Sequence, residues 1–147
     1  LPYYHSITRK VDLLELSKVL QPRLEKLSDV EESIDFINQA HPFDASIYTH
    51  KKMKTNPENS LEALELVKER MKDFHDFDND EAMTEFFVNL AKEKELKNGR
   101  IMWPVRVALT NKSFTPGGAV EIAHILGKEE TLRRIDQAII DLQNVIQ

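Results

Sequence analysis

The amino-acid sequence predicts an all-α fold, a helical bundle that forms one ordinary domain or two small subdomains. Its 147 residues are 41% hydrophobic, which is enough apolar material for a buried core. Along most of the chain the apolar residues recur at helical spacing, and capping residues precede several of these stretches. The polar, proline-containing stretch 41–57 is the best internal boundary. A division at this stretch gives residues 1–55 as a first helical subdomain and residues 56–147 as a second, C-terminal one.

Two helix starts lie in the first half of the chain. The stretch 28–31 reads Ser-Asp-Val-Glu, a capping box, and the apolar side chains of Val30, Ile34 and Ile37 follow on one face. Asn56 followed by Pro57 is a helix cap with proline at the first helical position. Both starts predict amphipathic helices. The apolar positions of the second helix are Leu61, Leu64 and Met71.

Three further helices are expected in the second half. One begins at Asp80 and ends at Lys97-Asn98-Gly99, a composition typical of a helix stop. The next is capped by Thr115-Pro116 and ends at Gly127. The last has a seam with alternating spacings of three and four, which we expect to pack on the domain rather than pair with a partner. The seam consists of Leu132, Ile135, Ile139, Leu142 and Ile146.

The segment 103–109 is ambiguous. Val105, Val107 and Leu109 alternate with other residues as a half-buried strand would, and Pro104 disfavours a helix interior. Periodicity alone leaves strand and helix open for this segment.

Charge and composition narrow the classes of function. The net charge is -5, yet the stretch 96–120 contains Lys97, Arg100, Arg106 and Lys112 and no acidic residue. This stretch predicts a basic face on an acidic body, or else a chance fluctuation of charge. The absence of cysteine excludes disulfides and thiolate metal sites, and no histidine spacing places two metal ligands on one helical face. No phosphate-binding glycine loop or nucleophile elbow is present, so we expect a cytoplasmic, non-catalytic domain without metal or membrane contact.

A longer pattern in the second half resembles a known family. The stretch 103–110 reads Trp-Pro-Val-Arg-Val-Ala-Leu-Thr, and it is followed by Thr115-Pro116-Gly117-Gly118 and by Gly127-Lys128-Glu129. This order and spacing resembles the signature near the C-terminus of bacterial-type glutamyl-tRNA synthetases. Upstream, the stretches 21–28 and 50–55 resemble segments of the same family. The resemblance implies an anticodon-binding region of two helical subdomains, with a helix for 103–109.

The resemblance also implies residues that read anticodon bases. Arg23 matches a family arginine that faces the third anticodon base, cytosine in glutamate tRNAs and guanine in glutamine tRNAs. Cytosine presents the acceptors O2 and N3 side by side, whereas guanine presents donors that would oppose a guanidinium. Arg106 matches the arginine at the middle base, a uracil with acceptor oxygens. The alternatives are that Arg23 caps a helix and that Arg106 forms a surface ion pair.

Other candidate positions lie in the same matching stretches and upstream of them. Thr115 and Pro116 match family positions near the first anticodon base, although Thr-Pro is also simply a good helix start. Gly118 departs from much of the family, which often has a larger apolar residue there. Trp103 is expected in the core rather than against a base. Candidates for phosphate contacts, or else members of a solvated polar face, are Lys51, Lys52, Lys54 and Lys112.

The expected partners follow from the same resemblance. They are the anticodon loop of tRNA(Glu) and an N-terminal catalytic domain, which would hold ATP and Mg, whereas this chain would hold no cofactor. The tract 50–55 faintly resembles a catalytic loop of class I synthetases but lacks its serine and final lysine, so we reject it as catalytic. We expect a monomer. The alternative function is a non-catalytic helical protein-protein interaction domain.

Overall fold

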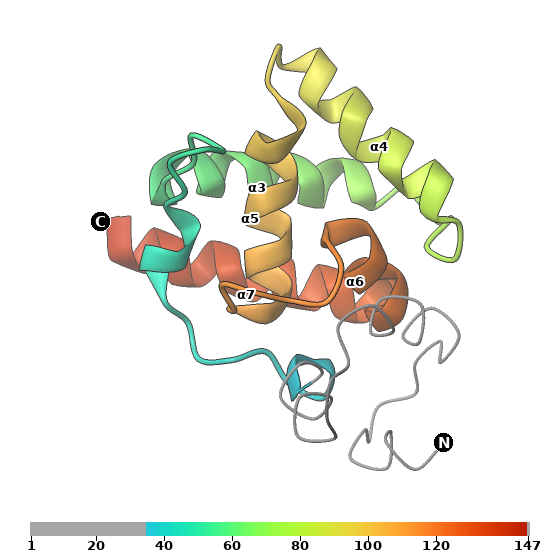
Figure 1. The fold of residues 1–147 in the computed structure, drawn as a ribbon. Coiled ribbons are helices and arrows are strands. Elements are labelled where there is room, and N and C mark those ends of the chain that lie inside the picture. Colours follow the sequence, from blue (N-terminus) through green and yellow to red (C-terminus); the bar gives the residue numbers. More distant parts are fainter. Residues whose placement is uncertain (1–34, 147) are drawn as a thin grey trace.

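The computed structural model describes residues 35–146, and this part of the chain is built from helices (Figure 1). Two short 3-10 helices, η3 (Asp35–Ile37) and η4 (Ala45–Tyr48), precede five α-helices. Within residues 35–146 there is no strand, only an isolated bridge between His50 and Thr55. The all-α prediction is confirmed. The predicted capping box at 28–31 and the site residue Arg23 lie outside the described residues, and the subdomain boundary at residue 55 stays a prediction.

Helix α3 (Pro57–Met71) begins where the sequence predicts. The Asn56 side chain accepts a hydrogen bond from the Asn59 amide at 2.8 Å, and the Asn59 side chain accepts one from the Asn56 amide at 2.9 Å. These reciprocal bonds satisfy amides that the first turn leaves without helical partners. One face of α3 is apolar and packs into the core. Its buried side chains are Ala63, Leu64, Val67 and Met71.

Helix α4 (Asp80–Glu93) starts as predicted but ends earlier. Its last turn closes through Glu95, which has a φ of 57°, while the Leu96 amide donates to the Ala91 carbonyl at 2.8 Å. This arrangement is a Schellman motif with glutamate at the left-handed position usually taken by glycine. The predicted stop at Lys97-Asn98-Gly99 is therefore wrong, because these residues cap and begin the next helix, α5 (Asn98–Thr110).

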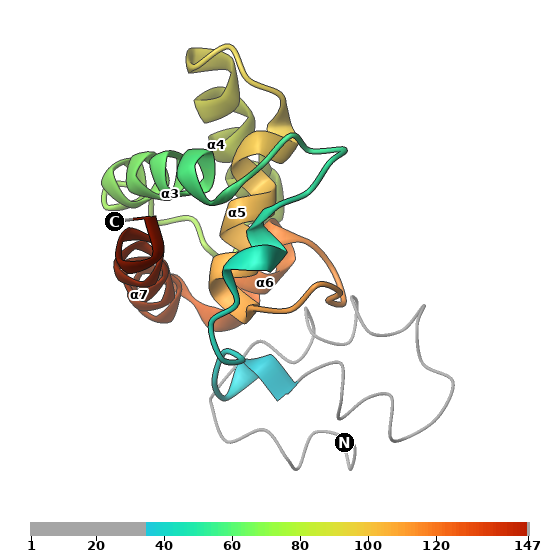
Figure 2. The same cartoon turned by 90° about the vertical axis from the view of Figure 1, so that its left-hand side faces the viewer.

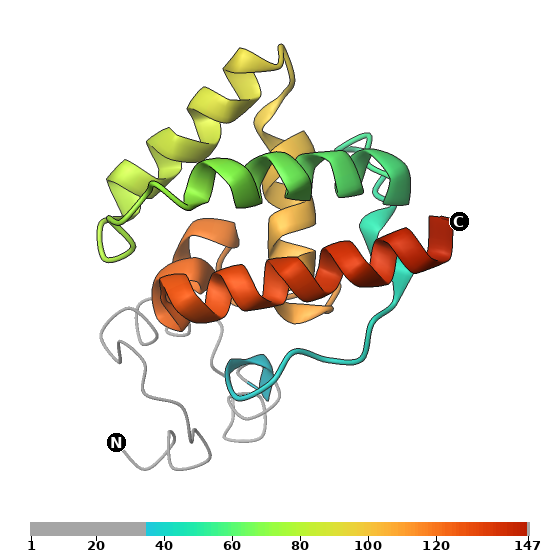
Figure 3. The same cartoon turned by 180° about the vertical axis from the view of Figure 1, so that it is seen from behind.

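Helix α5 is the central helix of the described fold. Figures 1 and 3 show α3 and α7 (Lys128–Ile146) side by side with α5 crossing both, and α4 and α6 (Ala119–Leu126) also contact α5. The helix that the resemblance implies for 103–109 is confirmed, with Pro104 inside it. Every residue from Pro104 to Thr110 is buried. A helix covered on all sides loses its 3.6-residue hydrophobic period, which explains why the pattern left a strand open.

The connection between α5 and α6 differs from the prediction at one point. Gly118, not Thr115-Pro116, is the residue that caps α6, and its amide donates to the Glu121 carboxylate at 2.9 Å. Gly127, with a φ of 84°, ends α6 as predicted. Ile135, Ile139 and Leu142 of the predicted α7 seam are buried in the core of this single chain, where α7 packs against α3.

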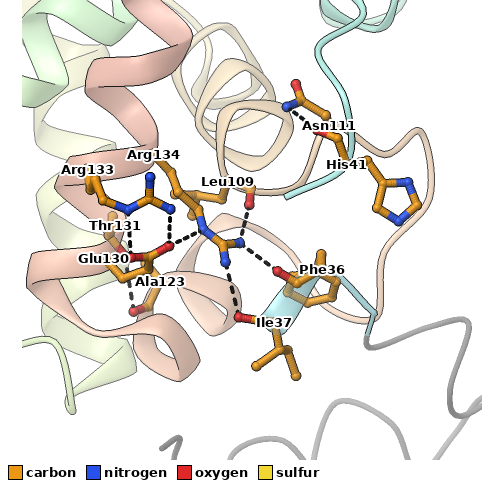
Figure 4. Close-up of polar contacts among 10 residues, drawn as sticks. All are labelled: Phe36, Ile37, His41, Leu109, Asn111, Ala123, Glu130, Thr131, Arg133 and Arg134. Atoms are coloured by element: carbon orange, nitrogen blue, oxygen red, sulfur yellow. Dashed lines mark hydrogen bonds and ion pairs between the residues drawn. The ribbon is translucent and has the colours of Figure 1, made fainter. Parts of the chain in front are cut away.

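The segment before α3 is tied to this core by Arg134 of α7 (Figure 4). The Arg134 guanidinium is 2% exposed and donates to the carbonyls of Phe36 at 2.7 Å, Leu109 at 2.7 Å and Ile37 at 3.1 Å. Glu130, one turn earlier, accepts from Arg134 Nε at 2.7 Å. One buried side chain thus joins η3, the end of α5 and α7.

Among residues 35–146, no helix is long and apolar enough to cross a membrane.

Candidate nucleic-acid interface

The loop between α5 and α6, residues 111–118, is held from behind by Arg106. Arg106 is 8% exposed, and its guanidinium donates to the Ser113 carbonyl and to the Thr115 hydroxyl, both at 2.8 Å. Its central carbon also lies 4.4 Å from the centroid of the Trp103 ring. Burial lowers the pKa of Arg106, but a guanidinium stays protonated in proteins. The surface ion pair considered for Arg106 is not what the structure has, because its bonds go to the 111–118 loop.

The positions expected near the first anticodon base lie in this loop. The Thr115 hydroxyl accepts from Arg106 and donates to the Gly117 carbonyl at 2.9 Å, and Gly117 has a φ of 80°. Pro116 is buried and supports the turn. At Gly118 an added Cβ would meet only the Glu121 carboxylate, at an ordinary 3.8 Å, so this position has room for a side chain. The backbone of the 111–118 loop is therefore held in one defined conformation.

A second loop, residues 50–55, displays lysines. His50 and Thr55 exchange two backbone hydrogen bonds of 3.2 Å, which close the loop, and Lys51, Lys52 and Lys54 between them are exposed. Exposed ammonium groups on a closed loop are suited to contacts with phosphates. We call residues 50–55 the lysine loop.

The Trp103 side chain connects the lysine loop to α5. Its indole nitrogen donates to the Ile47 carbonyl at 3.0 Å, and its ring lies 4.2 Å from the His50 ring, centroid to centroid. Arg106 contacts the same indole. Trp103 is half-buried against the core, as expected for a structural role. The two loops are thus linked through a contiguous row of side chains, and Figure 2 shows η4 beside α5 where this link is made.

Lys112 differs from the lysines of the 50–55 loop. Its ammonium lies 2.9 Å from the Asp35 carboxylate, and its side chain is only 14% exposed. His41 contacts the other oxygen of the same carboxylate at 2.9 Å. Burial opposes ionisation of Asp35, but the hydrogen bonds from Lys112 and His41 outweigh it and lower its pKa. Lys112 therefore ties the 111–118 loop to η3 and is less available to a phosphate than the exposed lysines.

One exposed side chain of the 111–118 loop was not predicted. Phe114 lies between Ser113 and Thr115 and is 88% exposed. The signal was a lone phenylalanine in the polar turn Asn-Lys-Ser-Phe-Thr-Pro-Gly-Gly, where no helical stripe accounts for it. The contact positions predicted from the sequence were Thr115 and Pro116, and Phe114 beside them was not among the candidates.

The ordered loops of this helical fold display lysines and an aromatic ring, which are groups suited to phosphates and to unpaired bases. The comparison with protein families makes this specific, because the anticodon binding domain family matches residues 1–139. The chain belongs to that family.

Named relatives agree with the family. The chain is 47% identical over 147 residues to the glutamate-tRNA ligase of Clostridium tetani, covering 99% of this chain and 30% of the relative. It is 46% identical over 144 residues to that of Clostridium botulinum, covering 97% and 30%. A crystal structure of a glutamate tRNA ligase from Elizabethkingia meningosepticum in complex with its amino acid has a TM-score of 0.75 at 25% identity, covering 96% of this chain and 28% of that one. The chain thus spans between 28% and 30% of the length of these relatives.

Proposed function

We propose that this chain is the anticodon-binding part of a glutamate-tRNA ligase and that it holds the anticodon loop of tRNA(Glu). The observation that carries the proposal is the buried Arg106, which orders the 111–118 loop in a chain of the anticodon-binding family. An ordered loop that offers hydrogen-bonding groups is what recognition of splayed, single-stranded bases requires. The lysine loop supplies charge nearby without a sequence preference.

The contacts divide between bases and phosphates. Arg23 faces the third anticodon base and selects cytosine over guanine. Arg106 and the loop that it holds face the middle base, and Thr115, Pro116 and Gly118 lie near the first. Lys51, Lys52 and Lys54 contact phosphates. Lys112 contributes mainly by holding the 111–118 loop through its ion pair with Asp35.

The complete ligase would join glutamate to tRNA(Glu) with ATP and Mg bound in a separate N-terminal catalytic domain. In this proposal the present chain contributes no catalytic residue, metal ligand or cofactor site. It acts by positioning the tRNA so that the acceptor end reaches the catalytic domain. We propose that it does so in the cytoplasm and as a monomer.

The test uses two labelled anticodon hairpins of tRNA(Glu) that differ only in cytosine or guanine as the third anticodon base. Fluorescence anisotropy at low salt should show tighter binding to the cytosine hairpin, by about 1–3 kcal/mol. Arg23→Gln should abolish this preference. Arg70→Gln on α3, whose guanidinium pairs with Glu93, removes the same charge elsewhere and should preserve it.

Two other outcomes are informative. Equal binding of both hairpins would remove Arg23 from recognition. No binding to either would favour the alternative, a helical protein-protein interaction domain, whose binding to a protein partner would change little with salt.

A further inference from the structure

Phe114 is an aromatic side chain that the described fold leaves in solvent. It is 88% exposed, whereas every other Phe, Tyr and Trp among residues 35–146 is buried or half-buried. Aromatic rings contribute large apolar surfaces and usually enter a core or an interface. The exposure of Phe114 is therefore unusual for an aromatic residue and points to an interface.

The ring is displayed on an ordered turn. Arg106 holds the residue before Phe114 through the Ser113 carbonyl and the residue after it through the Thr115 hydroxyl, at 2.8 Å each. The Thr115 hydroxyl continues to the Gly117 carbonyl, and the Asn111 side chain donates to the His41 carbonyl at 2.9 Å, which secures the start of the loop (Figure 4). A ring fixed in this way loses little backbone entropy when a ligand covers it.

The chemistry of the loop favours an unpaired nucleobase over an apolar protein surface. The stretch 111–118 contains no acidic residue, and the charged guanidinium of Arg106 is bonded to its centre, while the carboxylates of Asp35 and Glu121 contact only its ends, at Lys112 and Gly118. Among residues 35–146 the other exposed large apolar side chains belong to the lysine loop (Met53) and to α7 (Ile140, Val145 and Ile146), so Phe114 is the exposed one in the 111–118 loop. A single flat ring on a loop that is held by a guanidinium is suited to stacking on an unpaired base.

We infer that Phe114 stacks on an unpaired base of the anticodon loop and supplies affinity without selecting the base. This inference rests on the proposed function and adds to it a contact that needs no hydrogen bond to the base. Stacking on an aromatic ring is tolerant of sequence because every base has a π face. It should act beside the discriminating contacts of Arg23.

The first test measures affinity of the 147-residue chain for the cytosine hairpin. Phe114→Ala and Phe114→Leu should each raise Kd by about 5- to 150-fold, whereas Phe114→Tyr and Phe114→Trp should stay within about 3-fold of the unchanged chain. The dependence of log Kd on log salt should be the same for all of them, because no charge is removed. Val145→Ala, which truncates an exposed apolar side chain on α7, should leave Kd unchanged.

The second test reports the stack itself. Hairpins carry 2-aminopurine at each unpaired position in turn, and stacking on Phe114 should quench the fluorescence at one position. Quenching should persist with Phe114→Trp and be lost with Phe114→Leu. Because the ring is exposed, the thermal unfolding midpoint should be the same in all these variants, which separates a lost contact from a lost fold.

The outcomes separate the two proposals. If the unchanged chain binds the hairpin and Phe114→Ala binds equally well, stacking is overturned and anticodon binding stands. The same holds if Phe114→Leu binds and quenches like the unchanged chain, since an aliphatic side chain cannot stack. If the unchanged chain binds neither hairpin, the proposed function fails and the stacking contact fails with it.

Discussion

Arg106 is a charged side chain that the fold buries and also satisfies. Buried guanidinium groups are unfavourable unless hydrogen-bonded, and here the bonds go to a loop carbonyl and a loop hydroxyl. The same planar donor group spans both acceptors, which a single ammonium group could not do with the same geometry. Arg106 therefore sets the shape of the 111–118 loop, and any contact that the loop makes depends on it.

Replacement of Arg106 by lysine should loosen the loop and weaken hairpin binding by about 1–3 kcal/mol. Thr115→Val, which keeps the shape and removes the hydroxyl, should weaken it less. In a double-mutant cycle the two effects should be non-additive, because both substitutions break the same hydrogen bond. Additive losses in the anisotropy titrations would instead mean that Arg106 touches the RNA independently of Thr115.

At the scale of elements, the lysine loop depends on its packing against α5. Met53 lies over the first turn of α5, where it occupies the space that a Cβ on Gly99 would need. Its amide donates to the His50 ring at 3.2 Å, and that ring packs against Trp103 at an interplanar angle of 55°. Glycine at position 99 therefore permits a close approach of the loop to the helix, and the exposed lysines are displayed from a fixed base.

Removal of the lysines at 51, 52 and 54 should act on salt dependence more than on specificity. Each lost phosphate contact should reduce the slope of log K against log salt by about 0.7, so the triple alanine variant should lose about 2. The preference for cytosine over guanine should remain. Hairpin titrations from low to moderate salt measure both quantities, with a variant of the exposed Lys72 and Lys92 as control. An unchanged slope would exclude the lysine loop from the RNA interface.

At the scale of the whole molecule, the Arg134 cluster holds distant parts of the chain together. Its bonds to Phe36, Ile37 and Leu109 bring η3 to the end of α5, next to the 111–118 loop. Glu130 balances the charge. Hydrogen bonding from Arg133, together with Arg134, outweighs the opposing effect of burial and lowers the pKa of Glu130 to about 2.

This depressed pKa makes the stability of the fold depend on acid. Glu130 is ionised more readily in the folded chain than in the unfolded one, so its stabilising contribution is present above its ordinary pKa of 4.5 and is lost as pH falls toward about 2. Glu130→Gln should lower the unfolding midpoint at neutral pH and flatten its decline between those pH values. Thermal unfolding followed by circular dichroism measures this, and Glu65→Gln on the exposed face of α3 controls for the loss of one charge. If the unfolding midpoints of the two variants declined in parallel with falling pH, Glu130 would not be a cause of the acid sensitivity.

Local patterns were sufficient where local interactions decide the structure. The start of α3 at Asn56-Pro57 and the end of α6 at Gly127 were predictable, because caps and left-handed positions depend on a few neighbouring residues. The all-α class followed from the same patterns. The end of α4 did not, since glutamate instead of glycine occupies its left-handed position. Arg106 was named as a site residue from its resemblance to a family signature, but its hydrogen-bond partners were not foreseen.

The sequence by itself determined the helical class, the starts of α3 and α4 and the family signature around 103–118. Only the tertiary structure decided what those residues contact. The residues 104–110 of α5 are covered on all sides, so they include no polar face that would show a helical period. The sequence pattern was therefore also compatible with a strand. The tertiary structure also turned Lys112 inward to Asp35 and left Phe114 outside. The physical reason is that capping and periodicity act between residues a few positions apart, whereas burial and ion pairing depend on segments that meet only when the chain has folded.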